Sequence, residues 1–554
     1  MAGGTQGASM EADGEFDYIV VGGGSSGCVT AGKLVGEQGA RVLLLEAGGN
    51  DDDKLIKMPA GTFKMMLGGS AHIKHYVSEQ QKQLNGRTVG VPQGNVIGGG
   101  SSVNVMAYMR GCREDYDRWD AAIGGGWSWD DLLPHFRRQE GNVRLSNRSH
   151  GGDGPLKVSD PNYKVPASSY FLKAAQNGGI AFRDDFNAGE LGGVGYFQTT
   201  ISGARRCSSA DAFLTPVRHD PRLTLRTQCR VTRIRIENGK AVGVEYMRDG
   251  RPYFAKAGRS VILTAGAFAT PKLLMLSGIG PAEHLRSMGI HPLVDLPGVG
   301  QNLQDHVVVR LSAATDRNYG YFGEDRGLRM IRNGLRYYLF GDGPVASNGA
   351  ECVGFTNVDA AEGVADIQIY SVGILWPSAY TGAITHGITM MASQTQPQSR
   401  GSVRLRSADP ADDPVVDLGW LNHAEDVAVM IKGLRLLRRI AQTEPLASII
   451  AEERAPGPAL QSDAELEQYL RDTVESAYHP VGTCKAGRDG DPMAVLTPDL
   501  RVRGVDNLRV LDASMMPNIL SANTNAPVMA VADRGVDLMT GRQSLRMRSA
   551  DALA

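Results

Sequence analysis

The sequence predicts an α/β protein in which a discontinuous parallel-sheet domain receives an inserted, strand-rich domain. Two observations lead to this fold class. The first is a strand–helix–strand unit near the start, where apolar strands at 16–21 and 41–45 flank a helix over 25–35. The second is that strand-to-helix elements of the same kind return at 261–276 and from 508 onward. We therefore expect the polar strands and helices between them to form a separate unit.

The intervening segments carry their own signals. Residues 222–246 predict two or three strands with a turn at Asn238-Gly239. Apolar residues at helical spacing predict helices over 424–442 and 463–474. These elements give the inserted unit both strands and helices.

Two other segments have unusual composition. Residues 296–306 (LPGVGQNLQDH) predict a polar, glycine-rich loop. Residues 367–399 contain no Asp, Glu, Lys or Arg. Because Gln, Ser, Thr, Gly and Pro interrupt this stretch throughout, it predicts buried strands and not a membrane-spanning helix.

The first turn of the chain has the pattern Gly22-x-Gly24-x-x-Gly27, and Glu46 closes the second strand. Glycines there allow a tight turn, a close approach of a pyrophosphate and close helix–strand packing, and an acid in this place binds ribose hydroxyls. The pattern alone is weak in a chain with 69 glycines. Its position between a strand and a helix favours a dinucleotide site over a tight turn with a surface glutamate.

The segment 94–111 (GNVIGGGSSVNVMAYMRG) joins three glycines, two serines and an asparagine between apolar flanks. Backbone approaches a ligand closely only where side chains are missing, and Ser101, Ser102 and Asn104 offer short hydrogen-bonding groups. The segment predicts a wall for a large cofactor that has both an aromatic ring and phosphates. Its apolar residues argue against a flexible linker.

Composition sets limits on the function. A chain of 554 residues predicts two to three domains. A formal net charge of −2 gives no electrostatic basis for nucleic-acid binding. The six cysteines form no CxxC pair, so we expect reduced thiols, no disulfide framework and no metal site.

The N-terminal residues and one predicted surface helix bear on where the protein is located in the cell. Residues 1–15 are polar and acidic, and we expect a disordered lead-in and a cytoplasmic protein without a signal peptide or an integral membrane segment. Residues 327–339 predict an amphipathic helix with a separate arginine stripe. We interpret that stripe as a solvated face, although docking on a membrane or an acidic partner stays open. The stripe consists of Arg329, Arg332 and Arg336.

Two late segments are candidates for an active site, 478–483 (YHPVGT) and 521–527 (SANTNAP). The neutral imidazole of His479 can accept a hydroxyl proton near pH 7. The amide of Asn523 can hydrogen-bond the same oxygen without bringing a charge. Sequence spacing alone does not show that the two segments meet, and one histidine among eleven is more often a structural residue of the core.

Four motifs together resemble the glucose–methanol–choline (GMC) family of FAD-dependent oxidoreductases, and the similarity runs over 16–542. The resemblance implies a doubly wound FAD-binding domain and a substrate domain with an antiparallel sheet. It assigns 16–150, 200–310 and 478–542 to the first domain and 151–199 and 311–477 to the second. The motifs are Gly22–Gly27 with Glu46, 94–111, 266–281 (GAFATPKLLMLSGIGP), and 479–483 with 523–527.

The resemblance also assigns roles to single residues. His479 matches the general base of the family, and Asn523 matches its second catalytic position. Val231 matches a position that binds adenine through its backbone, and Tyr478 matches one beside the flavin. The remaining cofactor-binding positions are Gly22, Gly24, Ser25, Ser26 and Gly27 for the pyrophosphate, Glu46 and Ala47 for the ribose, and Val96, Gly100, Asn104, Ala107, Asp512, Ala513, Thr524 and Asn525 for the flavin and its ribityl chain.

Two departures from the family pattern matter. Some members attach the flavin covalently through a histidine where this chain has Val103, so we expect dissociable FAD. The family often has Arg-Met-Gly where this chain has Lys485-Ala486-Gly487, which concerns local packing and not the base.

The resulting expectation is the oxidation of a primary alcohol, with His479 as base and with O₂ or a quinone-type acceptor taking the electrons. The resemblance is closest to bacterial members that act on aromatic alcohols, furan-type alcohols and polyols. Two alternatives use the same scaffold, a flavin-dependent hydroxynitrile lyase and a non-catalytic FAD-binding protein. Pocket residues are expected near Ser347-Asn348 and in 367–376, where Trp376 is either a pocket wall or part of the core.

Overall fold

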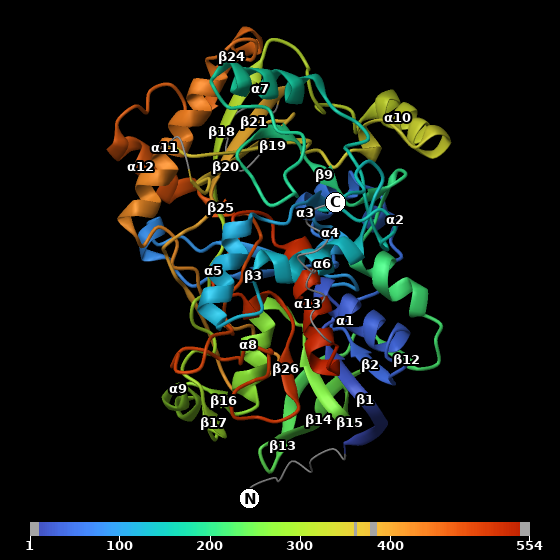
Figure 1. Ribbon diagram of the computed structural model, residues 1–554. Helices are drawn as coiled ribbons and strands as arrows, with labels where there is room; N and C mark the ends of the chain where they lie inside the picture. Colours follow the sequence, from blue (N-terminus) through green and yellow to red (C-terminus); the bar gives the residue numbers. More distant parts are fainter. Residues whose placement is uncertain (1–9, 359–362, 377–384, 543–554) are drawn as a thin grey trace, which may run out of the picture.

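The computed structural model describes residues 10–358, 363–376 and 385–542, and it is built around two seven-stranded sheets (Figure 1). The sheet drawn in the lower half of Figure 1 is mixed. Its strand order is β12 (Leu223–Arg226), β2 (Val42–Leu45), β1 (Glu11–Val21), β15 (Arg251–Leu263), β14 (Lys240–Arg248) and β13 (Arg230–Glu237), with β26 (Leu508–Val510) beside the end of β15.

The register of this sheet brings several strand ends to one level. Strands β12, β2, β1, β15 and β26 run parallel, and Val21 pairs with both Leu45 and Leu263. Gly22, Glu46 and Thr264 therefore emerge side by side at the carboxyl edge, where open α/β sheets bind their ligands. β13 and β14 extend the sheet as an antiparallel hairpin.

Helices cover this sheet and continue its strands. α1 (Ser25–Gly36) follows β1 and packs against α13 (Asn525–Thr540). α13 in turn packs against α6 (Trp129–Gln139), which contacts α5 (Arg113–Ile123). α8 (Gly266–Leu276) follows β15 and contacts β13. Ten of the twelve residues of α1 are buried, so this helix lies inside the molecule and not on its surface.

The second sheet is entirely antiparallel and lies in the upper half of Figure 1. α11 (Ala424–Ala441) packs on β21, and α7 (Pro166–Asn177) and α12 (Asp463–Thr473) complete the core beside it. The strand order is β24 (Ile450–Ala455), β18 (Val307–Thr315), β21 (Gly387–Gln394), β20 (Ile367–Val372), β19 (Cys352–Thr356) and β8 (Gly193–Tyr196), with β25 (Glu475–Ser476) also paired to β18.

The remaining helices and strands lie outside the two seven-stranded sheets. The helices are α2 (Lys54–Lys57), α3 (Gly61–Gly68), α4 (Gly100–Val103), α9 (Ala282–Ser287) and α10 (Gly327–Phe340), and the strands are β3 (Ile73–Val77), β4 (Gly90–Gly94), β5 (Ala107–Tyr108), β6 (Glu140–Asn142), β7 (Leu156–Val158), β9 (Gln198–Thr199), β10 (Ile201–Ser202), β11 (Arg205–Arg206), β16 (Ile279–Gly280), β17 (Val294–Asp295), β22 (Ser402–Arg404) and β23 (Val415–Asp417). Within the described ranges, no helix has the length and apolar character needed to cross a bilayer.

The predicted α/β class is confirmed, with one difference at the start of the first strand. β1 begins at Glu11 and not at Phe16, because Glu11 and Ala12 pair with β15 and Asp13 binds Arg226 and Tyr246. The last part of the expected lead-in is thus a strand, while residues 1–9 lie outside the described residues. The uncharged stretch contains strands β20 and β21, as expected, although 377–384 lie outside the described residues.

Candidate active site

A cavity of about 790 Å³ connects the two sheets. At one end it is lined by residues that follow β1, β2 and β15, such as Gly22, Glu46 and Thr264. At the other end it is lined by one face of the antiparallel sheet, including Gln368 and Tyr370 of β20. A ligand that fills the cavity therefore contacts both sheets.

Two helices begin at this cavity without a side-chain cap. Gly24 at the start of α1 and Thr524 at the start of α13 make no capping hydrogen bond, so the first N–H groups of both helices stay available. The Ser25 hydroxyl donates to Asn525 Oδ1 at 2.8 Å and holds the two helix starts together. Two converging helix N-termini form an anion site that suits a pyrophosphate.

The glycines of the first turn divide into those that line the cavity and one that does not. A Cβ on Gly24 would meet only Thr264 O, at 3.8 Å, so the other side of its backbone is open to a ligand. A Cβ on Gly27 would lie 1.9 Å from Gly22 O. Gly27 does not line the cavity, and it allows α1 to pack tightly against the turn.

Glu46 lies at the cavity with its carboxylate fixed by backbone groups. Gly23 N donates to Oε2 and Gly48 N donates to Oε1, both at 2.7 Å. Burial raises the pKa of Glu46, and the backbone hydrogen bonds oppose this effect. Ala47 and Val231 line the same end of the cavity, so the positions expected at the adenosine side of the cofactor are adjacent in the structure.

The segment 94–111 forms one wall of the cavity, as expected, but its serines play a different part. Gly100, Asn104 and Ala107 line the cavity. Ser101 Oγ donates to Gly98 O at 2.6 Å, and Ser102 Oγ donates to Ile97 O at 2.7 Å. The serine hydroxyls therefore hold the loop together from inside and do not face a ligand.

Val96, which was also expected at the cofactor, packs away from the cavity. Its side chain is fully buried in a small apolar cluster with Ile56, Met65 and Ile73, and it does not line the cavity. The residue anchors the start of the loop by packing. Other residues of the segment 94–111 line the cavity.

His479 and Asn523 meet at the cavity, which the sequence could not show. Asn523 Nδ2 lies 3.2 Å from His479 Nε2, and Gln368 donates to Asn523 Oδ1 at 3.4 Å. Tyr478, which also lines the cavity, has a left-handed φ of +67° that turns the chain sharply before the histidine. Ser26, Asp512, Ala513 and Asn525 are further expected residues that line the cavity.

His306, at the end of the polar loop 296–306, fixes the protonation of His479. His306 Nε2 lies 3.0 Å from Thr395 O, which can only accept, so Nε2 carries the proton. In the neutral ring Nδ1 is then an acceptor, and it lies 2.9 Å from His479 Nδ1, which must donate. The lone pair of His479 Nε2 is therefore directed toward Asn523 and the cavity.

Burial keeps both rings neutral. It lowers the pKa of His306 to about 4, although carbonyl acceptors oppose this. The pKa of His479 is lowered well below 6.5 by burial and by the neighbouring His306. Asp305 accepts from His479 N at 2.9 Å and fixes the backbone, while burial raises its own pKa to about 7.

The end of the cavity near the antiparallel sheet is aromatic and apolar. Arg310 is the cation there, and its guanidinium lies 2.7 Å from Glu475 and over the ring of Trp376. Among the described lining residues, the carboxylates are Glu46 and Asp512, both at the other end. Pocket residues were expected near Ser347-Asn348, and Ala350 lines the cavity while Ser347 and Asn348 themselves do not. The apolar lining consists of Phe63, Val308, Ala350, Tyr370, Val372, Trp376 and Met391.

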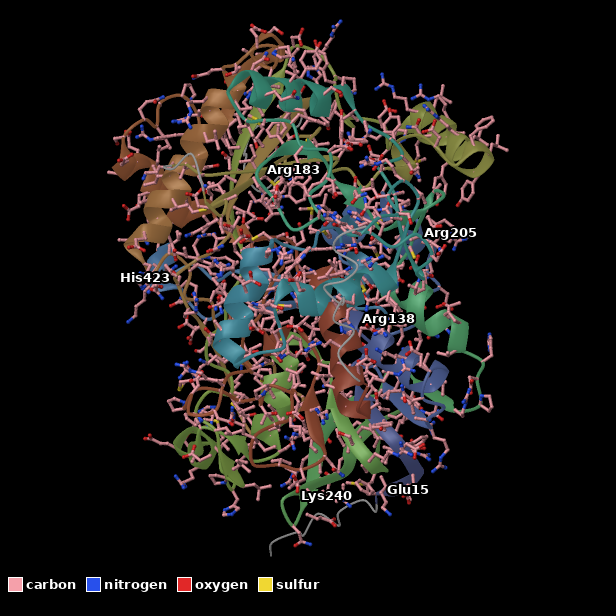
Figure 2. All side chains as sticks on the ribbon, in the orientation of Figure 1. Glu15, Arg138, Arg183, Arg205, Lys240 and His423 are labelled. Carbon is pink, nitrogen blue, oxygen red and sulfur yellow. The ribbon has the colours of Figure 1, made fainter. Side chains whose placement is uncertain are left out.

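One group in the described part of the chain has donor atoms close enough to hold a metal, His135, Asp533 and Asp537. Its carboxylates already face cationic side chains. Lys33 Nζ lies 2.9 Å from Asp533 and 2.7 Å from Asp537, and Arg138, labelled in Figure 2, binds both. The group is a buried ion-pair network that joins α1, α6 and α13.

Known proteins of similar sequence and structure fall into one family. Residues 16–308 and 397–532 match the N- and C-terminal parts of the family described as GMC oxidoreductase. The oxygen-dependent choline dehydrogenase of Sinorhizobium fredii is 38% identical over 532 residues, which is 96% of each chain. The alcohol dehydrogenase (acceptor) of Pseudomonas putida is 39% identical over 547 residues, 97% of each chain. Pyridoxine 4-oxidase from Mesorbium loti superposes with a TM-score of 0.86 at 31% identity, covering 95% of this chain and 99% of that one.

The cavity joins a dinucleotide-type sheet edge to a chamber that contains His479, an arrangement that suits an oxidoreductase with a large redox cofactor. The chain belongs to the GMC oxidoreductase family. It is therefore a FAD-binding flavoprotein that acts on CH–OH donors, and the expectation from the sequence is confirmed at this level. These relatives give no support to a hydroxynitrile lyase.

Proposed function

We propose that this enzyme oxidises a primary alcohol to the aldehyde, with His479 as the general base. His479 Nε2 accepts the hydroxyl proton, and Asn523 Nδ2 hydrogen-bonds the alcohol oxygen as negative charge develops on it. Bound FAD supplies the acceptor for the hydride that leaves the alcohol carbon. The observation that carries this proposal is the directed lone pair of His479.

The hydrogen-bond chain from Thr395 through His306 supports this role. A general base has to be neutral and has to present its lone pair to the substrate. These hydrogen bonds select the tautomer of His479, and burial keeps its ring neutral. A structural histidine of the core would not need a lone pair directed into a cavity.

The fit of the cavity to FAD supports non-covalent binding. The uncapped starts of α1 and α13 suit the pyrophosphate, Glu46 suits the ribose, and the wall at Gly100 has open space where a Cβ would stand. Val103 lines the cavity and offers no nucleophile for a covalent bond to the flavin. We infer that acid precipitation releases FAD into the supernatant.

The substrate end of the cavity favours an uncharged aromatic or branched alcohol. Tyr370, Trp376 and Met391 offer apolar contacts to an aromatic ring, while the charge of Arg310 is already paired with Glu475. Choline carries a quaternary ammonium, and no described carboxylate lines this end. We therefore expect aromatic or furan-type primary alcohols to react faster than choline.

We also propose the domain division expected from the sequence. The strands of the mixed sheet after residue 15 fall in the FAD-binding segments, and those of the antiparallel sheet fall in the substrate segments apart from the start of β18. A cytoplasmic location, with O₂ or a quinone as electron acceptor, belongs to the same proposal.

An anaerobic reduction screen tests the function. Purified yellow protein is mixed with benzyl alcohol, furfuryl alcohol or choline, and the flavin absorbance is followed. Bleaching by the aromatic alcohols supports the proposal, and repetition in air with peroxide detection separates O₂ from a quinone as acceptor. A flavin that stays oxidised with every alcohol would contradict oxidation and fit a lyase or a non-catalytic protein.

A further inference from the structure

The helix α10 (Gly327–Phe340) exposes an unusual amount of apolar surface. Figure 1 shows it projecting at the upper right, away from the body of the molecule, and its side chains extend outward in Figure 2. Leu328 is 84% exposed, Tyr338 70% and Phe340 78%. Leu335 and Ile331 are exposed as well. Isolated exposed apolar residues are ordinary, but a continuous set on one helix marks an interaction surface.

Five of the exposed apolar residues form a stripe on the outer face of the helix. Asn333 and Tyr337 are buried and attach α10 to the protein, and Asn333 Nδ2 donates to Glu324 O at 3.0 Å. A rotation of about 100° per residue places the apolar residues within a sector of about 100° opposite this attachment. We call this set the outer stripe, and it consists of Leu328, Ile331, Leu335, Tyr338 and Leu339.

Arginines run along one edge of the outer stripe. Arg329, Arg332 and Arg336 lie within the helix, which contains no acidic residue. Their carboxylate partners, Glu324 and Asp342, lie beyond the two ends of the helix. The side of the helix that faces outward is therefore apolar and basic at once.

We propose that α10 docks this enzyme in the plane of an anionic lipid bilayer. An amphipathic helix that carries arginines beside an apolar face lies at the level of the lipid headgroups. The outer stripe enters the acyl boundary, while the arginine stems bend outward to the phosphates. Fourteen residues span only about 21 Å as a helix, so α10 lies in the interface and does not cross it.

Charge favours the bilayer over a second copy of this chain. An antiparallel two-fold pair of α10 helices, joined through the outer stripe, would bring two arginine rows to the same narrow seam. The exposed Arg205 lies near Tyr337, on the attachment side of α10, and does not belong to this row. An anionic membrane satisfies the apolar stripe and the arginines together.

Vesicle co-sedimentation of the FAD-loaded full chain tests the proposal. We expect binding to phosphatidylcholine vesicles that contain phosphatidylglycerol, and weaker binding to pure phosphatidylcholine. The double variant L328E/L335E should weaken partitioning at least about tenfold, because two leucines leave the acyl boundary. Arg329→Gln, Arg332→Gln and Arg336→Gln should each cost up to about fivefold, on the anionic vesicles only.

A matched control separates the site from general surface effects. Val143 is 71% exposed elsewhere, and Val143→Glu should leave vesicle binding unchanged. Unaltered flavin content in each variant shows that the fold is intact. Equal binding of the wild-type chain and L328E/L335E would overturn the proposal, as would no binding of the wild-type chain. It would also be overturned if the variant abolished a dimer seen by sedimentation velocity while no vesicle binding occurred.

Discussion

Two buried histidines of this protein are held in opposite charge states. His150 lies between two carboxylates, with Nδ1 3.0 Å from Glu140 and Nε2 3.0 Å from Asp185. Both ring nitrogens must donate, so His150 is an imidazolium. The ring of His479 faces a neutral histidine and an amide, and no described carboxylate hydrogen-bonds it.

The difference shows how neighbours select the role of a buried imidazole. Burial opposes protonation of both rings, but the hydrogen bonds to Asp185 and Glu140 outweigh it and raise the pKa of His150. Burial and His306 lower the pKa of His479. An imidazole paired with carboxylates contributes to stability. A neutral imidazole without a carboxylate partner keeps a lone pair that can accept a proton.

The largest expected effect follows removal of the imidazole of His479, which has no carboxylate partner. His479→Ala should slow anaerobic flavin reduction by the alcohol by ~10²–10⁴-fold, because the hydroxyl proton loses its acceptor. Stopped-flow absorbance measures the rate, and flavin content reports the fold. The exposed His219 provides the control, since His219→Ala should leave the rate unchanged. Near-normal reduction in His479→Ala would remove the base from the proposal.

Breaking the paired site should affect stability instead of the reaction. Arg110 and Glu140 are both fully buried, 2.6 Å apart, and Glu140→Gln leaves the arginine and the imidazolium with one carboxylate fewer. We expect a loss of about 3–5 kcal/mol in the free energy of unfolding, measured in urea at neutral pH. Glu190→Gln breaks an exposed pair and should cost below about 1 kcal/mol. Equal effects of the two changes would refute this contrast.

The link between His306 and His479 can be broken and restored. His306→Leu leaves His479 Nδ1 without its acceptor, and a lost buried hydrogen bond of about 1–3 kcal/mol corresponds to a fall in flavin reduction of roughly 5–150-fold. His306→Gln should recover much of the rate, because an amide can accept from His479 and donate to Thr395. If His306→Leu and His306→Gln slow flavin reduction to the same extent, His306 does not act through the tautomer of His479.

The smallest expected effect comes from giving His479 a carboxylate neighbour, as His150 has. The base works only when neutral, so its activity is lost as pH falls through its pKa, and the lowered pKa of His479 keeps kcat/KM level to well below pH 6.5. Asn523→Asp puts a carboxylate beside Nε2 and should raise that pKa, because a negative charge stabilises the imidazolium. The acid limb of kcat/KM then moves to higher pH. Asn523→Ala, which adds no charge, should lower the rate without moving the limb.

Much of the fold could be predicted from local patterns. Apolar runs and helical spacing predicted α1, β2, α11 and α12 to within two residues at each end. The start of β1 escaped prediction because its first residues are polar and gain their place only by pairing with β15. The hairpin of β13 and β14 followed from the turn at Asn238 and Gly239, although its antiparallel addition to the parallel strands did not.

The site was predictable where a motif fixes the backbone and not where side chains choose their direction. Gly24 and Glu46 lie at the cavity as their spacing indicated. Ser101 and Ser102 were expected to face a ligand, but the loop uses their hydroxyls for its own carbonyls. His306 went unnoticed in a polar loop, because a buried hydrogen bond between two rings leaves no mark on sequence spacing.

The sequence by itself determined the glycine turn, the apolar strands that place it at a sheet edge, and the residue types needed for proton transfer. These properties are local, since they depend on backbone freedom and on the period of apolar residues. Only the tertiary structure decided that His306, His479 and Asn523 meet, because these residues come from segments that are distant along the chain. Their burial and mutual hydrogen bonds, which no local pattern encodes, set the tautomer and the neutral charge of the base.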